Sequence, residues 1–266
     1  VKSQIDLQPA FTEPRRLEVP YEISADQTDA KSYLTLNWML SEAGDPELVL
    51  GLAILEQALI GTPASQLRKA LIDSGLGEDL AGQGLETGLR QMMFSTGLKG
   101  VEKDNLPKVE KIILDTLAAL ALNGVDPENI AAAINTIEFR LRENNTGPYP
   151  RGLLLMIRSL ESWVYDKDPI APLAFEKSLQ SIKDRMKTGE PYFEHLIEAY
   201  LVNNTHRTTL ALIPDADLAK RRESEERTKL DQIRAEMDEK AIEKVVEDCF
   251  TLKQRQETPD SPENLS

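Results

Sequence analysis

The sequence predicts an α+β protein, in which an antiparallel or mixed sheet forms one layer and helices pack on one of its faces. Three observations lead to this prediction: period-two stretches near both ends of the first 214 residues, a long helix-rich middle, and an apolar content of 41% with only 5% aromatic residues. Strands that bracket a helical middle are typical of α+β folds rather than of parallel alternating ones. A charged C-terminal stretch adds a predicted helical hairpin.

The stretch Ser32–Gly100 supplies the predicted centre of the fold. Apolar and more polar residues alternate over Ser32–Leu40, which predicts a strand. A capping Asp and a Pro then begin an almost wholly apolar helix over Leu48–Ile60, in which Glu56 and Gln57 are the polar exceptions. A helix this apolar is expected to be covered on more than one side. A second helix and two glycine-bearing strands complete the stretch, predicted over Gln66–Ile72, Glu78–Thr87 and Arg90–Gly100.

Further elements are predicted on both sides of this centre. Arg15–Ile23 reads as a strand, and we expect it at a sheet edge because Pro20 has no N–H to donate. His206–Ile213 is predicted as a closing strand that ends before Pro214. Helices between them are predicted from capping residues, prolines and three-to-four spacing, over Asp104–Asn123, Asp126–Leu141, Gly152–Tyr165, Leu173–Met186 and Tyr192–Val202.

The composition changes abruptly after Pro214, which divides the chain into three predicted parts. Residues 1–214 form the α+β domain, residues 215–256 a charged helical-hairpin linker, and residues 257–266 a disordered tail. Two short apolar stripes, one ending at Met237 and one at Cys249, suggest hairpin arms that pack together. Because no Gly or Pro marks the turn, one continuous bent helix remains an alternative.

Charge and cysteine content exclude several classes of function. A formal net charge of −14 argues against nucleic acid or an anionic membrane as a partner, and it is compatible with cationic peptides. The one cysteine, Cys249, excludes an intramolecular disulfide framework and suits a reducing compartment. No apolar run approaches the length of a membrane span. The chain begins at Val1 rather than Met, and we expect it to be a fragment of something longer.

A search for reactive side chains gives no candidate site. The two histidines, His195 and His206, lie in different predicted elements. Glu198 could lie beside His195, but a structural zinc site needs four ligands and a catalytic one needs three plus water. We interpret His195 as a partly exposed helical residue, His206 as a strand-entry residue and Cys249 as a small core residue. The glycines match no phosphate-binding or dinucleotide fingerprint and are expected at turns and close backbone approaches.

Several passages resemble a known family. They are a helix-turn-helix passage, a strand passage, a polar strand entry and the charged C-terminal stretch, at Gly61–Gly77, Arg90–Lys99, Asn203–Leu210 and 215–256. Together they resemble insulinase/pitrilysin-type zinc metallopeptidases, above all the presequence-protease (oligopeptidase) subfamily. The resemblance covers nearly all of residues 15–256 and corresponds to the second domain of such a protein plus its helical-hairpin linker.

This resemblance implies a position inside a larger enzyme. Such peptidases have related α+β domains in two halves, joined by a helical hairpin, that close around a peptide chamber. Their metal is held by an inverted His-x-x-Glu-His helix and a downstream Glu in the first domain, and their transition-state Arg and Tyr come from the last domain. No His-x-x-Glu-His occurs here, so no catalytic, cofactor-binding or metal residue is carried over to this chain. Zinc is expected in the full-length parent and not in this fragment.

The resemblance thus implies a non-catalytic chamber-wall domain and hinge of a zinc metalloendopeptidase that degrades short unstructured peptides of the presequence or transit-peptide type. Its partners would be the other domains of the same polypeptide and peptides in the chamber, with no nucleic acid and no membrane. Its location would be the bacterial cytoplasm, the mitochondrial matrix or the plastid stroma. The alternative is a free-standing, peptidase-inactive scaffold or binding subunit of the same fold. An unrelated helical adaptor is a third possibility, which predicts no mixed sheet.

Overall fold

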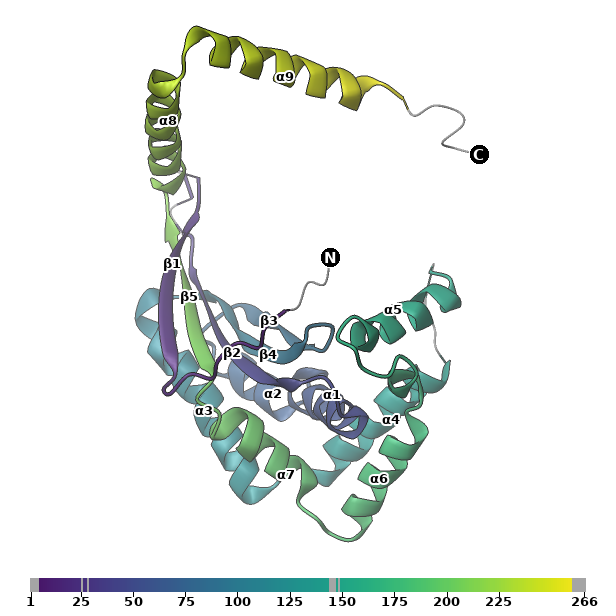
Figure 1. The fold of residues 1–266 in the computed structure, drawn as a ribbon. Coiled ribbons are helices and arrows are strands. Elements are labelled where there is room, and N and C mark those ends of the chain that lie inside the picture. Colours follow the sequence, from purple (N-terminus) through teal and green to yellow (C-terminus); the bar gives the residue numbers. More distant parts are fainter. Residues whose placement is uncertain (1–4, 25, 28, 144–146, 148, 260–266) are drawn as a thin grey trace. The chain divides into compact units, whose positions relative to one another are not determined.

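A five-stranded sheet with helices on one face forms the centre of the protein (Figure 1). The structure is a computed structural model that describes residues 5–24, 26–27, 29–143, 147 and 149–259. The chain divides into two compact units, described separately below. Residues 1–21 and 27–214 form the body, and residues 22–26 and 215–266 form the C-terminal unit.

The strands of the sheet run in the order β1-β5-β2-β4-β3. Their bounds are β1 Arg15–Glu22, β2 Ser32–Glu42, β3 Asp79–Glu86, β4 Gln91–Val101 and β5 Arg207–Asp215. Strand β2 pairs antiparallel with β4 on one side and with β5 on the other, and β3 pairs antiparallel with β4. The predicted edge position of β1 is confirmed, as a strand that contains Pro20 requires.

Strand β2 separates the two faces of the sheet by the alternation of its side chains. Leu34, Leu36, Trp38 and Leu40 are buried on the face that the helices cover, while the residues between them are half-buried on the other face. The indole Nε1 of Trp38 donates a hydrogen bond of 2.8 Å to the carbonyl oxygen of Leu201, which ties the core strand to the chain just before β5. The predicted strand Ser32–Leu40 is therefore confirmed.

Helices α1 (Pro46–Ile60), α2 (Gln66–Asp73) and α3 (Leu106–Asn123) lie on this covered face (Figure 1). The Asp45 carboxylate accepts a hydrogen bond of 2.9 Å from the backbone N–H of Glu47, so the predicted cap of α1 is in place. Helix α1 also packs against helices farther along the chain, as its apolar sequence predicted. The core they share includes Ile54, Leu55, Leu59, Leu67, Leu71, Val109, Ile113 and Leu117.

The middle of the chain contains the other predicted helices. Their bounds are α4 Pro127–Glu143, α5 Arg151–Trp163, α6 Glu176–Lys187 and α7 Tyr192–Ile197. A single π-helical turn, η3 (Glu198–Val202), continues α7, and short 3-10 turns lie at η1 (Lys103–Asn105) and η2 (Ala171–Leu173). Helix α6 begins later than the predicted Leu173, because residues 171–173 form the separate turn η2.

Gly97 shows why glycine is required in the middle of β4. A Cβ atom built there would collide with the backbone carbonyl of Leu34 on the neighbouring strand. Gly97 pairs with Thr35 in the antiparallel register, so this is a close approach of two backbones rather than a turn. The prediction that strand glycines mark close backbone approaches is confirmed at this position.

The C-terminal unit contains the helices α8 (Leu218–Glu236) and α9 (Glu239–Glu257). Met237 is extended, and the Asp238 carboxylate accepts a hydrogen bond of 2.8 Å from the backbone N–H of Ala241, so an Asp cap separates the helices without Gly or Pro. The expectation that the two arms pack together is wrong in this structure. Apolar side chains of both stripes are exposed, among them Leu230, Ile233, Val245 and Val246.

Cys249 and the tail depart from their sequence predictions in different ways. Cys249 is exposed on α9, so the expectation of a small core residue is wrong. In the described part of the chain, the apolar stripe to which Cys249 belongs has no facing stripe to bury it. Of the predicted disordered tail, Glu257 still belongs to α9, and residues 260–266 lie outside the described part of the chain.

Replacing a core leucine tests the assignment of the covered face. We expect Leu36→Ala and Leu55→Ala each to lower the free energy of unfolding by about 2–5 kcal/mol, because each change removes buried methyl groups and leaves a cavity. Leu36 and Leu55 are 0% and 2% exposed, whereas the control position Leu122 on α3 is 84% exposed. Chemical denaturation of the three variants measures the difference. Equal stability of Leu36→Ala and Leu122→Ala would show that the core is placed wrongly.

Candidate functional site

The predicted absence of a metal site was based on the number of donors, and the structure shows where these donors lie. His195 is exposed on α7, Glu198 is exposed at the start of η3, and His206 is buried just before β5. Within the described residues, no three His, Cys, Asp or Glu side chains form a group that could hold a metal ion. The donor set of this chain therefore does not fit zinc, and we derive no chemical step through a metal.

His206 lies at the entry of β5, as its sequence position predicted. Its ring packs edge-on against Phe11, with ring centroids 4.3 Å apart, and Thr205 Oγ1 donates a hydrogen bond of 2.7 Å to the carbonyl of Phe11. Burial lowers the pKa of His206, and the nearby Arg15 lowers it further. An imidazole that stays neutral in this way suits an anchor for the N-terminal segment.

The two polar exceptions in α1, Glu56 and Gln57, both have structural partners. Glu56 Oε1 accepts a hydrogen bond of 3.1 Å from the backbone N–H of Leu85, beside the irregularity in β3. Burial raises the pKa of Glu56, and the Leu85 hydrogen bond and Arg140 oppose that rise. Gln57 Oε1 accepts from Arg140 Nη1 at 3.2 Å. These residues hold β3 and α4 against α1, so neither is free for chemistry.

A cavity of about 420 Å³ lies between the start of α1, the end of α4, helix α5 and the turn η2. Its lining is mostly apolar and comes from residues that are far apart in the sequence, including Val49, Ala53, Ile137, Leu141 and Phe175. Cavities of this size and character can take a small apolar group. This site was not predicted from the sequence, because its walls meet only in the folded chain.

Polar side chains from α4, α5 and the following loop lie at the rim of this cavity. Burial raises the pKa of Glu161, the charge of Glu86 raises it further, and Arg158 opposes the rise. Lys167 Nζ lies 3.8 Å from the carboxylate of Glu42. Ser162 Oγ donates a hydrogen bond of 2.9 Å to the backbone carbonyl of Asp168, which fixes the loop after α5.

The cavity is built for binding rather than for a reaction. Its serine is engaged with backbone carbonyls, and among the described residues that line it no histidine or cysteine is present. Nucleophilic catalysis needs a hydroxyl or thiol beside a base, and this lining does not provide that pair. The cavity can orient an apolar group beside charged rim residues, which is a binding function.

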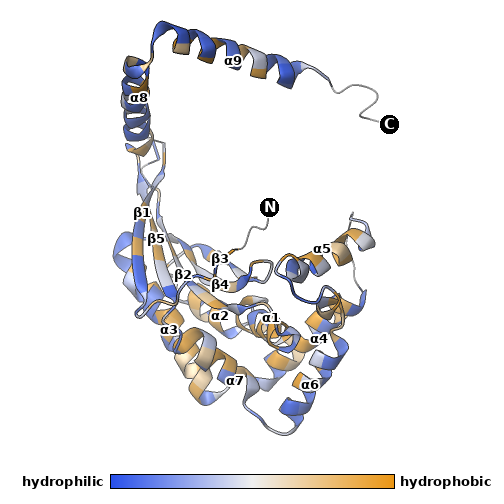
Figure 2. Cartoon of the chain, in the orientation of Figure 1, coloured by the Kyte–Doolittle hydropathy of each residue, from blue (hydrophilic) through white to orange (hydrophobic). Residues whose placement is uncertain are grey.

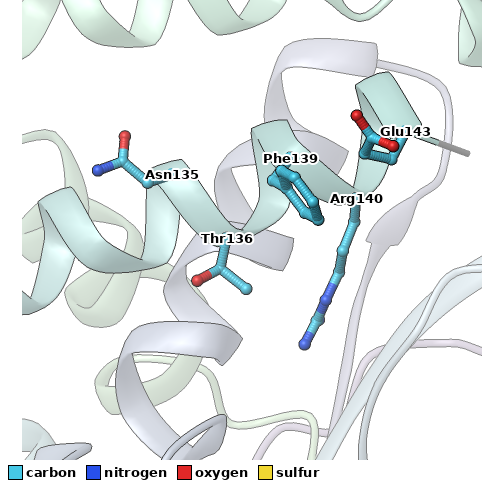
Figure 3. Close-up of a pocket in the computed structure, with 5 residues that line it drawn as sticks. All are labelled: Asn135, Thr136, Phe139, Arg140 and Glu143. Atoms are coloured by element: carbon cyan, nitrogen blue, oxygen red, sulfur yellow. The ribbon is translucent and has the colours of Figure 1, made fainter. Parts of the chain in front are cut away.

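A second hollow, drawn in Figure 3, is formed by side chains of α4 alone. Asn135, Thr136, Phe139, Arg140 and Glu143 spread along the helix, and Arg140 extends away from Glu143. Thr136 Oγ1 is already bonded to the carbonyl of Ala132 at 2.8 Å. Because these side chains do not converge on one point, this hollow is a weaker candidate than the cavity beside α1.

Comparison with protein families identifies the chain. The profile described as "Peptidase M16 inactive domain" matches residues 2–137, just over half of the chain. The chain belongs to the M16 peptidase family. A second profile, for the region associated with subfamily C of the M16 peptidases, matches residues 212–266 of this chain. The presequence-protease resemblance and the α+β fold expected from it are thereby confirmed.

Relatives of this M16 chain include "Presequence protease 1, chloroplastic/mitochondrial" of Arabidopsis thaliana. It is 44% identical over 267 residues, which cover 99% of this chain and 25% of that protein. "Protein HypA" of Clostridium perfringens is 36% identical over 266 residues, which cover 100% of this chain and 27% of that protein. The mitochondrial presequence protease of Xenopus laevis is 26% identical over 97% of this chain and 25% of its own length. The chain thus spans about a quarter of the length of these relatives.

Solved structures share the fold of this M16 domain. The inactive peptidase domain of a zinc protease from Bordetella parapertussis superposes with a TM-score of 0.57 at 19% identity, covering 70% of this chain and 92% of that one. A protease from Helicobacter pylori gives a TM-score of 0.59 at 14% identity, covering 77% and 45% of the two chains. None of the described helices has the length and apolar content needed to cross a membrane.

The charge of Glu161 gives a prediction about pH. Because the pKa of Glu161 is raised in the folded state, the folded chain holds its proton to higher pH than the unfolded chain does. The free energy of unfolding therefore falls as pH rises from the usual glutamate value of 4.5 through the raised value. We expect Glu161→Gln to unfold at a higher temperature than the wild type at pH 7, and this gain to shrink toward pH 4.

Thermal unfolding between pH 4 and 8 measures this effect. Glu13→Gln is the matched control, because Glu13 is exposed in the segment before β1. A gain in Glu161→Gln that stays constant over the whole pH range would contradict the assignment of a partly buried carboxylate with a raised pKa. So would an equal gain in Glu13→Gln.

Proposed function

We propose that this chain is a non-catalytic chamber-wall domain and hinge of a zinc metalloendopeptidase that degrades short unstructured peptides of the presequence or transit-peptide type. The observation that carries the proposal is the alignment with the Arabidopsis presequence protease, which extends over 99% of this chain but only 25% of that enzyme. A match of this extent is expected when a chain corresponds to one domain with its linker. The other domains of the same polypeptide are then its first partners.

The donor chemistry supports the non-catalytic part of the proposal. A catalytic zinc site needs three protein ligands and an open position for water. His195 and His206 lie in different elements, and His206 is packed against Phe11. Zinc and the reacting groups would therefore be supplied by other domains of the parent, and this chain would be inactive alone.

The face of the sheet opposite the helices supports the wall role. Tyr33, Thr35, Asn37 and Met39 of β2 point to that face and are half-buried. Asn37 Nδ2 donates to the carbonyl of Thr208 at 3.2 Å, and Ser95 Oγ donates to Asn37 Oδ1 at 2.8 Å. Residues held in this way form a firm polar and apolar surface that suits contact with an extended peptide.

The division of the chain into parts belongs to the same proposal. Residues 1–214 act as the wall domain, residues 215–256 as the linker and hinge, and residues 257–266 as a tail. The highly charged, exposed surface of α8 and α9 supports the hinge role, because an element with few buried contacts can change position at low cost. We place the parent in the bacterial cytoplasm, the mitochondrial matrix or the plastid stroma, by analogy with the compartments named for its relatives.

Zinc binding and peptide cleavage test this function directly. The purified chain is expected to bind no stoichiometric zinc and to leave an unstructured cationic peptide intact, while the parent protein cleaves that peptide and loses activity on chelation. Cleavage by the isolated chain with bound zinc would overturn the proposal. A reading frame that ends with this chain and has no metal-site domain before it would favour the free-standing scaffold instead.

Removal of the C-terminal helices tests the proposed boundary at Pro214. A chain that lacks residues 215–266 is expected to keep one cooperative unfolding transition, because the core residues of the sheet and its helices all precede the deleted segment. Calorimetry or circular dichroism on heating measures this. Loss of the cooperative transition would show that the body depends on the C-terminal unit.

A further inference from the structure

Helix α5 has an unusual distribution of apolar residues. Leu153, Met156, Ile157, Leu160 and Val164 recur at three-to-four spacing, which places them on one face of the helix and the turn that follows it. Except for the half-buried Leu160, these residues are exposed, with Met156 at 51% and Val164 at 63%. Trp163 extends the same surface and is 62% exposed. We call these six residues the α5 stripe; Figure 2 shows the apolar character of the helix.

The opposite face of α5 is the one turned to the body, and it is partly polar. Arg158, Glu161 and Ser162 line the cavity beside α1. Leu154 and Leu155 are half-buried, and the described element against which α5 chiefly packs is the short turn η2. A surface helix normally buries its apolar face and exposes its polar one. In α5 this arrangement is reversed, so the described residues leave the apolar face without a cover.

We infer that the α5 stripe is the docking surface for another domain of the same polypeptide, an inference that rests on the function proposed above. About three quarters of the length of the relatives lies outside the segment that this chain matches, so ample protein is available to cover the stripe. Contiguous apolar surface of this kind marks an interaction site. The stripe also contains Trp163 and Met156, residue types that are enriched in the centres of interfaces.

Charge separates this partner from the peptide substrate. Within α5 two arginines, Arg151 and Arg158, stand against one glutamate, Glu161, whereas the whole chain carries a net charge of −14. A cationic peptide would be repelled from this local excess of positive charge. The complementary partner is an apolar surface with an acidic rim, as another domain of an acidic polypeptide can present.

Cysteine labelling tests the docking in the protein as it exists. In a Cys249→Ser background, Met156→Cys is compared between the isolated chain and the parent protein, with a charged maleimide as the probe. The isolated chain is expected to label freely, and the parent to label about tenfold or more slowly, because a docked surface excludes the reagent. Lys177→Cys, an exposed position on α6, reports the reactivity of the reagent in each sample. Labelling of Met156→Cys at the same rate in both proteins overturns the inference.

A charge placed in the stripe supplies a second measurement. Ile157→Glu is expected to leave the melting temperature of the isolated chain unchanged, because Ile157 is 41% exposed there. In the parent it is expected to lower the melting temperature, whereas Lys177→Glu does not. An Ile157→Glu parent that melts like the wild type also overturns the inference.

Other occupants give different results. If the isolated chain forms a dimer in sedimentation and Ile157→Glu dissociates it, a second copy is the partner and the inference is wrong. If Met156→Cys in the parent becomes protected only when peptide is added, the stripe binds substrate instead. Peptide cleavage by the same parent preparation tests the proposed function separately. Activity with free labelling at Met156 rejects the docking alone, whereas protection without zinc-dependent activity rejects the proposed function alone.

Discussion

The pairing of β2 with both β4 and β5 is the constraint on which the rest of the structure depends. Leu34 lies opposite Leu98 on one side and Ala211 on the other, so one register fixes three strands. A shift by one residue would move Leu34, Leu36 and Trp38 to the uncovered face. The close approach of Gly97 to the Leu34 carbonyl adds a steric condition to the same register. The helices can pack on the sheet only because this alignment places the large apolar side chains of β2 on their side.

Much of the body could be predicted because its signals are local. Alternation in β2, the Asp45 cap of α1 and Pro20 in β1 each act within a few residues, and each led to an element that the structure contains. The family resemblance then supplied the fold that these elements form, and the family and structural comparisons agree with it. Local physics and the tertiary fold are consistent over most of residues 15–214.

Predictions failed where the sequence specifies a face but not its cover. The stripes of α8 and α9 were expected to bury each other, and Cys249 with them, yet Cys249 and most of the apolar side chains of both stripes are exposed. Periodicity shows which residues share a face of a helix, and it does not show what lies opposite. The cavity beside α1 was missed for a related reason, since its lining comes from four separate parts of the chain. The spacing of Arg158, Glu161 and Ser162 within an otherwise apolar helix is the signal that could have indicated it.

The two tryptophans of this chain lie in opposite environments, and this gives the protein two optical reporters. Trp38 is fully buried with its indole N–H bonded to Leu201, so its emission is blue-shifted and changes when the sheet unfolds. Trp163 is solvated on α5, so its emission is red-shifted and open to quenching by iodide. Phenylalanine at either position isolates the signal of the other. A single fluorescence spectrum can thus follow the integrity of the core and the hydration of the α5 surface at the same time.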